Sequence, residues 1–286
     1  MKILYSSLDL TEWRQNIEPS KVVGFVPTMG ALHDGHLSLV KQCIDNSDVS
    51  IISIFLNPKQ FSKNEDLGSY PQNIESDLKQ LKKLGVDAVF VPGVNDIYAE
   101  NDTFELRETA LSLKLEGKSR PHFFGGVLTV VSKLFNMVRP LKTFFGQKDA
   151  QQLMLIKKMV GDMKYPIEVV GCSTVREKNG LAMSSRNEYL SREEKNDASI
   201  IYKALMEAEK ILRENNVSAK VVKEKVFGLF NSKKNIKVDY VSVANVGSLE
   251  EIDGLISSDV LVSVAVYIRN VRLIDNVLCK KNNVGG

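Results

Sequence analysis

The feature that most constrains the fold is the alternation of short apolar runs with amphipathic stretches over the first 170 or so residues. The apolar, β-rich runs lie at Val22–Val26, Val49–Phe55, Asp87–Val91, Thr143–Phe145 and Ile167–Cys172. Between them, Leu37–Ile44, Ile74–Leu84, Val127–Val138 and Ala150–Met163 have helical spacing or buried-helix composition. Strands that are apolar on both faces and alternate with helices are typical of a parallel sheet covered on both sides. The sequence therefore predicts an α/β fold with a Rossmann-like N-terminal domain.

The pattern changes after about Val175. We expect one long charged helix at Ser191–Leu212, opened by a capping box of Ser191 and Glu194. A second helix is expected at Ala219–Phe230, followed by strands at Lys237–Val243, Val260–Tyr267 and Val271–Ile274. This composition predicts a smaller α+β domain. We place the two domains at 1–174 and 175–286, which agrees with the number expected for 286 residues.

Charge and cysteine content exclude several classes of protein. The 38 basic and 35 acidic residues give a net charge of +3, too balanced for a dedicated nucleic-acid or membrane-surface binder. The 3 cysteines are far apart and form no CxxC or zinc spacing. The N-terminus lacks the apolar run of a signal peptide, and the longest apolar stretch, near Val260–Ile268, is too short to span a membrane. We expect a cytoplasmic globular protein.

The first segment whose residues could bind a ligand or take part in catalysis is Pro27–His36, PTMGALHDGH, directly after the first long strand. Ligands of open parallel sheets lie beyond the carboxyl ends of strands, and a helix N-terminus there favours phosphate. His33 and His36 are three residues apart, so two imidazoles can share one face of a helical turn. Polyphosphate binding is the preferred interpretation. The alternatives are a packing turn with two exposed histidines, or a zinc pair, for which no third ligand is evident.

The second segment is Phe144–Gln152, FFGQKDAQQ, where another strand gives way to a helix. Lys148 at an exposed helix start could reach a phosphate, Asp149 a ribose hydroxyl, and Gln152 the same cleft one turn later. The alternative is a solvated first helical turn.

Two further segments carry polar groups at suggestive places. Ala182–Asn187, AMSSRN, lies between the predicted domains, and its two hydroxyls and guanidinium could wrap an anion unless it is only a polar linker. Phe55–Phe61, FLNPKQF, ends the second long strand, and Asn57 and Gln60 suit a small polar organic substrate. Here the alternative is an Asn-Pro turn.

Taken together, these segments resemble a known family. A HxGH turn followed much later by Ser-Ser-Arg is similar to the nucleotidylyltransferase superfamily. The full set, PTMGALHDGHLSLV, NPKQF, LEGKSRP, VSKLFN, FGQKDAQQ, AMSSRN and RLIDN in this order, resembles the pantothenate synthetases, or pantoate–β-alanine ligases, over nearly the whole chain.

The resemblance implies an AMP-forming ligase. In this family the carboxylate of pantoate attacks the α-phosphorus of ATP, and β-alanine then attacks the pantoyl adenylate and releases AMP. A carboxylate is already ionised at neutral pH, so the first step needs positioning and charge stabilisation and no base. Mg²⁺ is expected on the β- and γ-phosphates, with Asp77 a weak candidate ligand, and a homodimer is expected as well.

The resemblance also implies site residues. His36, His33 and Lys148 are the expected catalytic donors, with His36 in the family's proton-donor position. Gln60 and Gln152, each able to donate and accept, match the pantoate-binding glutamines, and Gln60 also borders β-alanine. The second domain would act as a lid. The expected ATP contacts are Met29, Gly30, Ala31, Leu32, His33, Asp34, Gly35, His36, Gly146, Gln147, Lys148, Asp149, Val175, Met183, Ser184, Ser185 and Arg186.

One segment departs from the family. Where the family reads RPGHFxGV, this chain has His122 in place of the glycine and Phe123 in place of the histidine. This segment resembles a flap over the site, and we interpret His122 as a surface-loop residue without a role. No general base for the second step is evident, so solvent or the reacting phosphate would take the proton.

Two other functions compete with the ligase. A nucleotidylyltransferase would join AMP to a phosphorylated acceptor, which arginine or lysine would suit better than Gln60 and Gln152. A nucleotide sensor would bind without turnover, and would need fewer phosphate donors than His33, His36, Lys148 and Arg186. A tRNA-charging enzyme would need a more basic surface. Pantoate-dependent exchange between ATP and pyrophosphate separates these classes.

Overall fold

The chain forms two compact units, Met1–Ser173 and Thr174–Gly286, each described here by itself. This is a computed structural model that describes residues 1–62, 65–214 and 217–280. The end of the predicted second domain, 281–286, lies outside the described residues. Among the described residues, no helix is long and apolar enough to cross a membrane.

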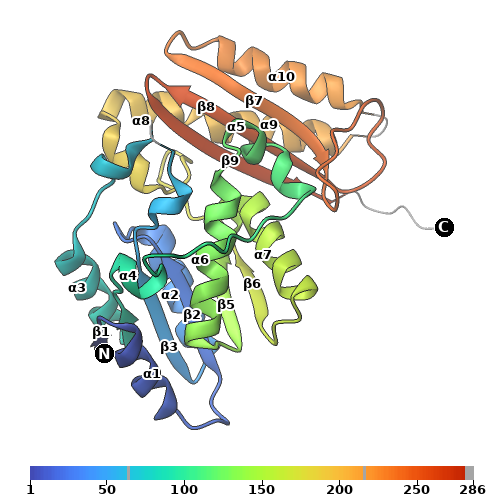
Figure 1. The fold of residues 1–286 in the computed structure, drawn as a ribbon. Helices are drawn as coiled ribbons and strands as arrows, with labels where there is room; N and C mark the ends of the chain where they lie inside the picture. The colour runs from blue at the N-terminus through green and yellow to red at the C-terminus, as the bar shows by residue number, and fades with distance from the viewer. Residues whose placement is uncertain (63–64, 215–216, 281–286) are drawn as a thin grey trace. The chain divides into compact units, whose positions relative to one another are not determined.

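Unit 1 is built on a six-stranded parallel sheet in the order β1-β4-β3-β2-β5-β6 (Figure 1). Its strands are β1 (Lys2–Leu4), β2 (Val23–Thr28), β3 (Val49–Ile54), β4 (Ala88–Phe90), β5 (Lys142–Gly146) and β6 (Glu168–Cys172). Its principal helices are α1 (Ser7–Gln15), α2 (Asp34–Asp45), α3 (Ile74–Leu84), α6 (Phe123–Val138) and α7 (Ala150–Asp162). The predicted α/β class is confirmed.

The sheet is covered on both faces, as its continuous apolar strands predict. Phe25 of β2 meets Phe135 of α6 edge-on, with ring centroids 6.4 Å apart. The next residue, Val26, points to the opposite face, because successive side chains of a strand alternate. There it joins a buried cluster with Val40 of α2 and Leu81 of α3.

The strand order places a topological switch point beside β2. From β2 the sheet runs to β3 and β4 on one side, whereas the chain later returns to pair β5 on the other side. The carboxyl ends of β2 and β5 therefore lie next to each other, at the position where open α/β sheets bind ligands.

Unit 2 packs an antiparallel sheet, β7-β8-β9, against two long helices. The strands are β7 (Ile236–Asn245), β8 (Val260–Ile268) and β9 (Val271–Cys279). The two long helices are α9 (Ile200–Leu212) and α10 (Ala219–Asn231), and the short α8 (Arg192–Ala198) precedes them. The small α+β composition is confirmed, with β9 extending well beyond the predicted Ile274.

The prediction of one helix over Ser191–Leu212 was wrong. The capping box of Ser191 and Glu194 is present, but α8 ends at Ala198 and α9 starts at Ile200. Ser199 marks the break, because its hydroxyl donates to the carbonyl of Asn196 at 2.6 Å. Such a side-chain bond to the backbone competes with the helical ladder.

A close approach between β2 and α2 generates the first testable prediction. A methyl group added at Gly24 would lie 2.1 Å from Ser47 Oγ and 2.7 Å from Cys43 Sγ. Because such overpacking typically costs about 1–3 kcal/mol, Gly24→Ala should lower the unfolding midpoint in urea. Trp13, the 1 tryptophan of the chain, lies buried on α1 of the same unit and supplies the fluorescence signal.

Gly161→Ala is the matched control for this measurement. An added methyl at Gly161 meets no atom within 4 Å, and the residue lies within α7. Alanine is favoured over glycine in a helix, so the midpoint should stay the same or rise. Equal loss in both variants would contradict the packing assigned to Gly24.

Candidate active site

The turn between β2 and α2 has an unusual backbone. Gly30 and Ala31 both have positive φ, +84° and +49°. Glycine adopts this region freely, whereas for alanine it is strained, so surrounding contacts must hold the turn in place.

Asp77 of α3 supplies those contacts. Its carboxylate is 2 % exposed and accepts hydrogen bonds from the backbone amides of Ala31 at 3.0 Å and Leu32 at 2.8 Å. Gln80, one helical turn further on, donates to the carbonyl of Leu32 at 3.5 Å. These two amides are therefore committed to Asp77. The carboxylate therefore anchors the turn, and its expected role as a weak Mg²⁺ ligand stays a prediction.

Two imidazoles stand at the start of α2. His33 and His36 are stacked, with ring centroids 4.1 Å apart and planes inclined by 27°. His33 is the N-cap residue, and its Nδ1 accepts a hydrogen bond from the amide of Gly35 at 3.1 Å. The proton of a neutral His33 ring must then be on Nε2, which faces away from Gly35 as a donor. In the part of the chain that the structure describes, the enclosed Nδ1 of His36 has no hydrogen-bond partner.

Both rings are held neutral. Burial, and after it the charge of Lys148, lowers the pKa of His33 to about 4. Burial, followed by the charges of His33 and Lys148, places the pKa of His36 well below its ordinary value. At neutral pH the pair thus offers N–H groups without charge, beside a lysine that carries one.

Lys148 belongs to the turn after β5, which brings it to the same edge of the sheet. Gly146 ends the strand, the 3-10 helix η4 (Gln147–Asp149) follows, and α7 starts at Ala150. Lys148 is half-buried, where the sequence predicted an exposed position. Asp149 occupies the N-cap of α7 but makes no capping hydrogen bond with its side chain. An added methyl at Gly146 meets no atom within 4 Å, so there is open space beside this turn.

The two glutamines predicted to bind substrate lie on different elements. Gln60 ends the 3-10 helix η1 (Pro58–Gln60) after β3 and is 7 % exposed. Its Nε2 lies 2.9 Å from Met29 Sδ, which joins Gln60 to the turn between β2 and α2. Gln152 is half-buried in the first turn of α7, and no hydrogen bond between described residues links it to Gln60. Its neighbour Gln151 is structural, because it binds the carbonyls of Leu111 and Lys114.

A close contact between η1 and α6 fixes the position of Gln60. A methyl group at Gly126 of α6 would lie 2.4 Å from the carbonyl oxygen of Lys59 and 2.7 Å from the amide of Gln60. Glycine is therefore required at this position for the two backbones to approach.

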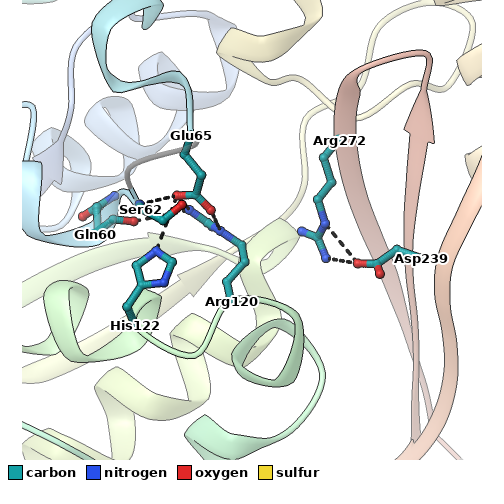
Figure 2. A network of polar contacts seen from close by, with 7 residues as sticks. All are labelled: Gln60, Ser62, Glu65, Arg120, His122, Asp239 and Arg272. Carbon is teal, nitrogen blue, oxygen red and sulfur yellow. Dashed lines mark hydrogen bonds and ion pairs between the residues drawn. The ribbon is translucent and has the colours of Figure 1, made fainter.

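The segment that departs from the family takes part in a network of charges (Figure 2). Arg120 pairs with Glu65 through two hydrogen bonds of 2.6 and 2.8 Å and donates to the Gln60 carbonyl at 3.3 Å. Burial disfavours the Glu65 carboxylate, but Arg120 outweighs this effect and lowers the pKa of Glu65 to about 2. His122 lies in the turn before α6 with its side chain 37% exposed, and its Nε2 is 3.6 Å from a carboxylate oxygen of Glu65. Its interpretation as a surface-loop residue without a role stays a prediction. Phe123 packs its ring under the Arg120 guanidinium, with 3.9 Å from Cζ to the centroid.

The remaining predicted ATP contacts belong to unit 2. Met183 donates its amide to the carbonyl of Val175 at 3.0 Å, so these two backbone positions are neighbours. Ser184 caps the 3-10 helix η5 (Ser185–Tyr189) by accepting from the amide of Arg186. The hairpin that carries them is held by Arg176, which forms an ion pair with the buried Asp275. Contact of this segment with ATP stays a prediction.

Sequence reasoning missed several contacts that shape the candidate site, among them the anchoring role of Asp77, which it considered only as a metal ligand. Asp77 had a signal, because it falls on the apolar stripe of α3 with Ile74, Leu78 and Leu81, where a carboxylate must find donors. No local sequence signal predicts the contact of the Tyr98 hydroxyl with Asn57, at 2.7 Å, or the ion pair of Arg120 with Glu65. Both contacts join segments that are far apart in the chain.

Comparison with known proteins gives a consistent result. The family model described as pantoate-β-alanine ligase matches residues 2–278. The pantothenate synthetase of Acetivibrio thermocellus is 47% identical over 258 residues, covering 90% of this chain and 92% of its own, and that of Thermotoga petrophila is 43% identical over 279 residues, covering 97% and 99%.

Solved structures agree with this. The crystal structure of pantothenate synthetase from Thermus thermophilus matches with a TM-score of 0.91 and 37% identity, covering 97% of this chain and 99% of that one. A pantoate-β-alanine ligase from Francisella tularensis, complexed with beta-gamma ATP and β-alanine, matches with a TM-score of 0.80 and 35% identity over 97% of each chain. Together with the two turns at the switch point, these matches establish that the chain belongs to the pantoate–β-alanine ligase family.

Proposed function

We propose that this chain catalyses the ATP-dependent condensation of pantoate with β-alanine to give pantothenate, AMP and pyrophosphate, through a pantoyl-adenylate intermediate. The observation that carries the proposal is the meeting of two turns at one edge of the sheet. The stacked pair His33 and His36 follows β2, and Lys148 follows β5, close enough for its charge to act on both rings. Family membership over nearly the whole chain supports the same reaction.

The first step joins the pantoate carboxylate to the α-phosphorus of ATP and releases pyrophosphate. Negative charge grows on the departing oxygen, and donors fixed in advance stabilise it most effectively. Lys148 would supply a charged donor, and the Nε2–H of His33 a neutral one. The low pKa of His36 favours hydrogen-bond donation by a neutral ring over proton release from an imidazolium.

The rest of the nucleotide would follow the two turns. Met29 to His36 and Gly146 to Asp149 would border the phosphates and ribose, with the side chain of Asp149 uncommitted to the helix cap. From the second unit, Val175 and Met183 would border adenine and Ser184 to Arg186 the phosphates. These assignments rest on family motifs, and so does the role of unit 2 as a lid.

Pantoate would lie beside the turn between β2 and α2. Gln60 touches Met29 and Gln152 follows Lys148 by one helical turn, so both glutamines belong to elements that border the phosphate donors. Neutral amides suit the hydroxyls and carboxylate of pantoate. In the second step the amine nitrogen of β-alanine attacks the acyl carbon, the bond to AMP breaks, and the amine proton passes to solvent or to the departing phosphate.

Mg²⁺ is expected with ATP, on the β- and γ-phosphates. Among the described residues there is no group of three or more His, Cys, Asp or Glu that could hold a metal ion, and Asp77 already binds two backbone amides. The residues present therefore do not form a dedicated cage, and phosphate and water oxygens would be its main ligands. We also infer a homodimer and a cytoplasmic location from family resemblance.

Replacing Lys148 tests the phosphate site. Lys148→Ala should lower pantoate-dependent exchange between ATP and pyrophosphate by about 10²-fold or more, because a charged donor to the reacting phosphates is lost. The unfolding midpoint followed by Trp13 should change little. Lys157→Ala, at an exposed position of α7, is the matched control and should retain full exchange. Normal exchange in a folded Lys148→Ala variant would remove this residue from the mechanism.

The charge states of the histidines can be measured directly. In NMR spectra of histidine-labelled protein, assigned with His33→Gln and His36→Gln, the His33 ring should titrate near pH 4 and the His36 ring well below 6.5. The unfolded chain binds these protons near pH 6.5, so the free energy of unfolding should fall as the pH drops from 6.5 toward 4. A midpoint near 6.5 for either ring would show that it is not neutralised by burial and Lys148.

Replacing Gln60 tests whether this residue belongs to the proposed pantoate site and not to the proposed ATP site. Gln60→Ala should lower kcat/KM for pantoate by about 10- to 100-fold, because a polar group of the substrate loses its partner in a closed site. ATP affinity measured by calorimetry should stay nearly the same. Weakened ATP binding together with unchanged pantoate kinetics would show that the pockets are assigned the wrong way round.

A further inference from the structure

A chain of hydrogen bonds leads from Tyr98 through Asn57 to Gln60, and backbone groups fix which atom donates and which accepts in it. Asn57, just before η1, is 1 % exposed, and its side-chain amide bonds to groups inside the protein. Its Nδ2 is 3.1 Å from the carbonyl of Gly126, and its Oδ1 is 3.2 Å from the amide of Lys59. A carbonyl can only accept and a backbone N–H can only donate, so these two groups allow one orientation of the Asn57 amide.

Tyr98 is the first donor of this chain of hydrogen bonds. This residue follows the short helix α4 (Val94–Ile97) and is 5 % exposed, with its hydroxyl 2.7 Å from Asn57 Oδ1. Because Oδ1 is an acceptor, the hydroxyl must be the donor. Burial, and then the nearby Asp102, raises the pKa of Tyr98, so the hydroxyl keeps the proton that it donates. Lys59 lies over the ring, 4.2 Å from its centroid, and holds it in place.

The fixed orientation passes from Asn57 to Gln60. The second proton of Asn57 Nδ2 reaches Gln60 Oε1 at 3.1 Å. Gln60 Oε1 therefore accepts from within the protein, which fixes the orientation of the Gln60 amide, and Nε2 points the other way, toward Met29 Sδ at 2.9 Å. A thioether sulfur is a weak acceptor, so a substrate oxygen at that place would be a better partner for the N–H groups.

We infer that Asn57 and Tyr98 are positioning residues that make Gln60 a donor-only contact in the substrate pocket, so that Gln60 selects an oxygen acceptor of the substrate. The inference rests on the proposed function, in which Gln60 meets pantoate. It narrows the sequence-based expectation that Gln60 would both donate and accept. The substrate groups that satisfy a donor-only amide are a carboxylate oxygen, or a hydroxyl oxygen through its lone pairs.

Gln60→Glu tests the direction of the contact. The new carboxylate can still accept from Asn57, so packing should be preserved, but at neutral pH it presents an oxygen anion where the substrate expects a donor. We expect kcat/KM for pantoate to fall about 10²-fold or more, at least as far as in Gln60→Ala, with ATP affinity nearly unchanged. Relative to wild type at each pH, activity should recover as the pH is lowered toward 5, because a protonated carboxyl has an O–H donor.

A double-mutant cycle tests the relay, by which we mean the action of Asn57 on the substrate through its hydrogen bond to Gln60. With its carboxylate ionised, Asn57→Asp cannot donate to Gln60, so at neutral pH it should lower kcat/KM for pantoate by about 10-fold in the wild-type background and by less than about 3-fold when Gln60 is already alanine. Should Asn57→Asp fail to fold, Tyr98→Phe serves instead and should raise the KM for pantoate by about 2- to 10-fold. Tyr165→Phe, which removes a hydroxyl bound to Ser132 at 2.8 Å, is the matched control and should leave kcat/KM for pantoate and for ATP unchanged.

The outcomes distinguish the inference from the proposed function. Wild-type protein without pantoate-dependent exchange contradicts the function itself. Active wild type with a Gln60→Glu variant that uses pantoate normally at neutral pH overturns the donor-only assignment. Independent, multiplying effects of Asn57→Asp and Gln60→Ala would show that Asn57 acts on the substrate by itself, which overturns the relay.

Discussion

The position of β2 in the sheet brings the residues of the candidate active site together. β2 pairs in parallel with β3 on one side and β5 on the other, although β3 and β4 both lie between β2 and β5 in the chain. Parallel strands end at the same edge, so the turn after β2, η1 after β3 and the turn after β5 are forced together. Without this pairing, His33 and Lys148 would be unrelated polar residues at helix starts.

The site combines anchored geometry with neutral donors. Asp77 holds the strained turn at Ala31 through two amides, at the cost of burying a carboxylate. Burial keeps His33 and His36 uncharged, and Lys148 adds to the effect, so the positive charge of the site is concentrated on lysine. In the proposed reaction, the polyphosphate of ATP would meet donors that need no rearrangement when charge moves toward the leaving group.

The sequence predicted the architecture well because local patterns decide it. Continuous apolar strands, helical spacing at Ile74–Leu84 and the capping box at Ser191 all carry their signal within a few residues. The break at Ser199 was missed because the charged helical pattern continues across it. β1 and α1 were missed as well, although Ser6 and Asp9 form a capping box at the start of α1.

The site was predictable as a set of motifs but not as a network. His33, His36, Lys148 and Gln60 stand at strand ends, where pattern and position agree. The partners that orient them come from distant segments: Asp77 from α3, Tyr98 from the segment after β4, and Gly126 from α6. No local pattern links Tyr98 to Asn57, and only the folded structure shows which side of the Gln60 amide is left for a substrate.

The central claim is that the carboxylate of pantoate becomes bonded to the AMP portion of ATP at this site. It is tested most directly by supplying pantoate labelled with ¹⁸O in both carboxylate oxygens, together with ATP and β-alanine, and recovering the products for mass spectrometry. Attack on the α-phosphorus followed by cleavage of the acyl–oxygen bond predicts one ¹⁸O in each AMP released and none in pyrophosphate. Unlabelled AMP, or label in inorganic phosphate with ADP as the product, would contradict the account.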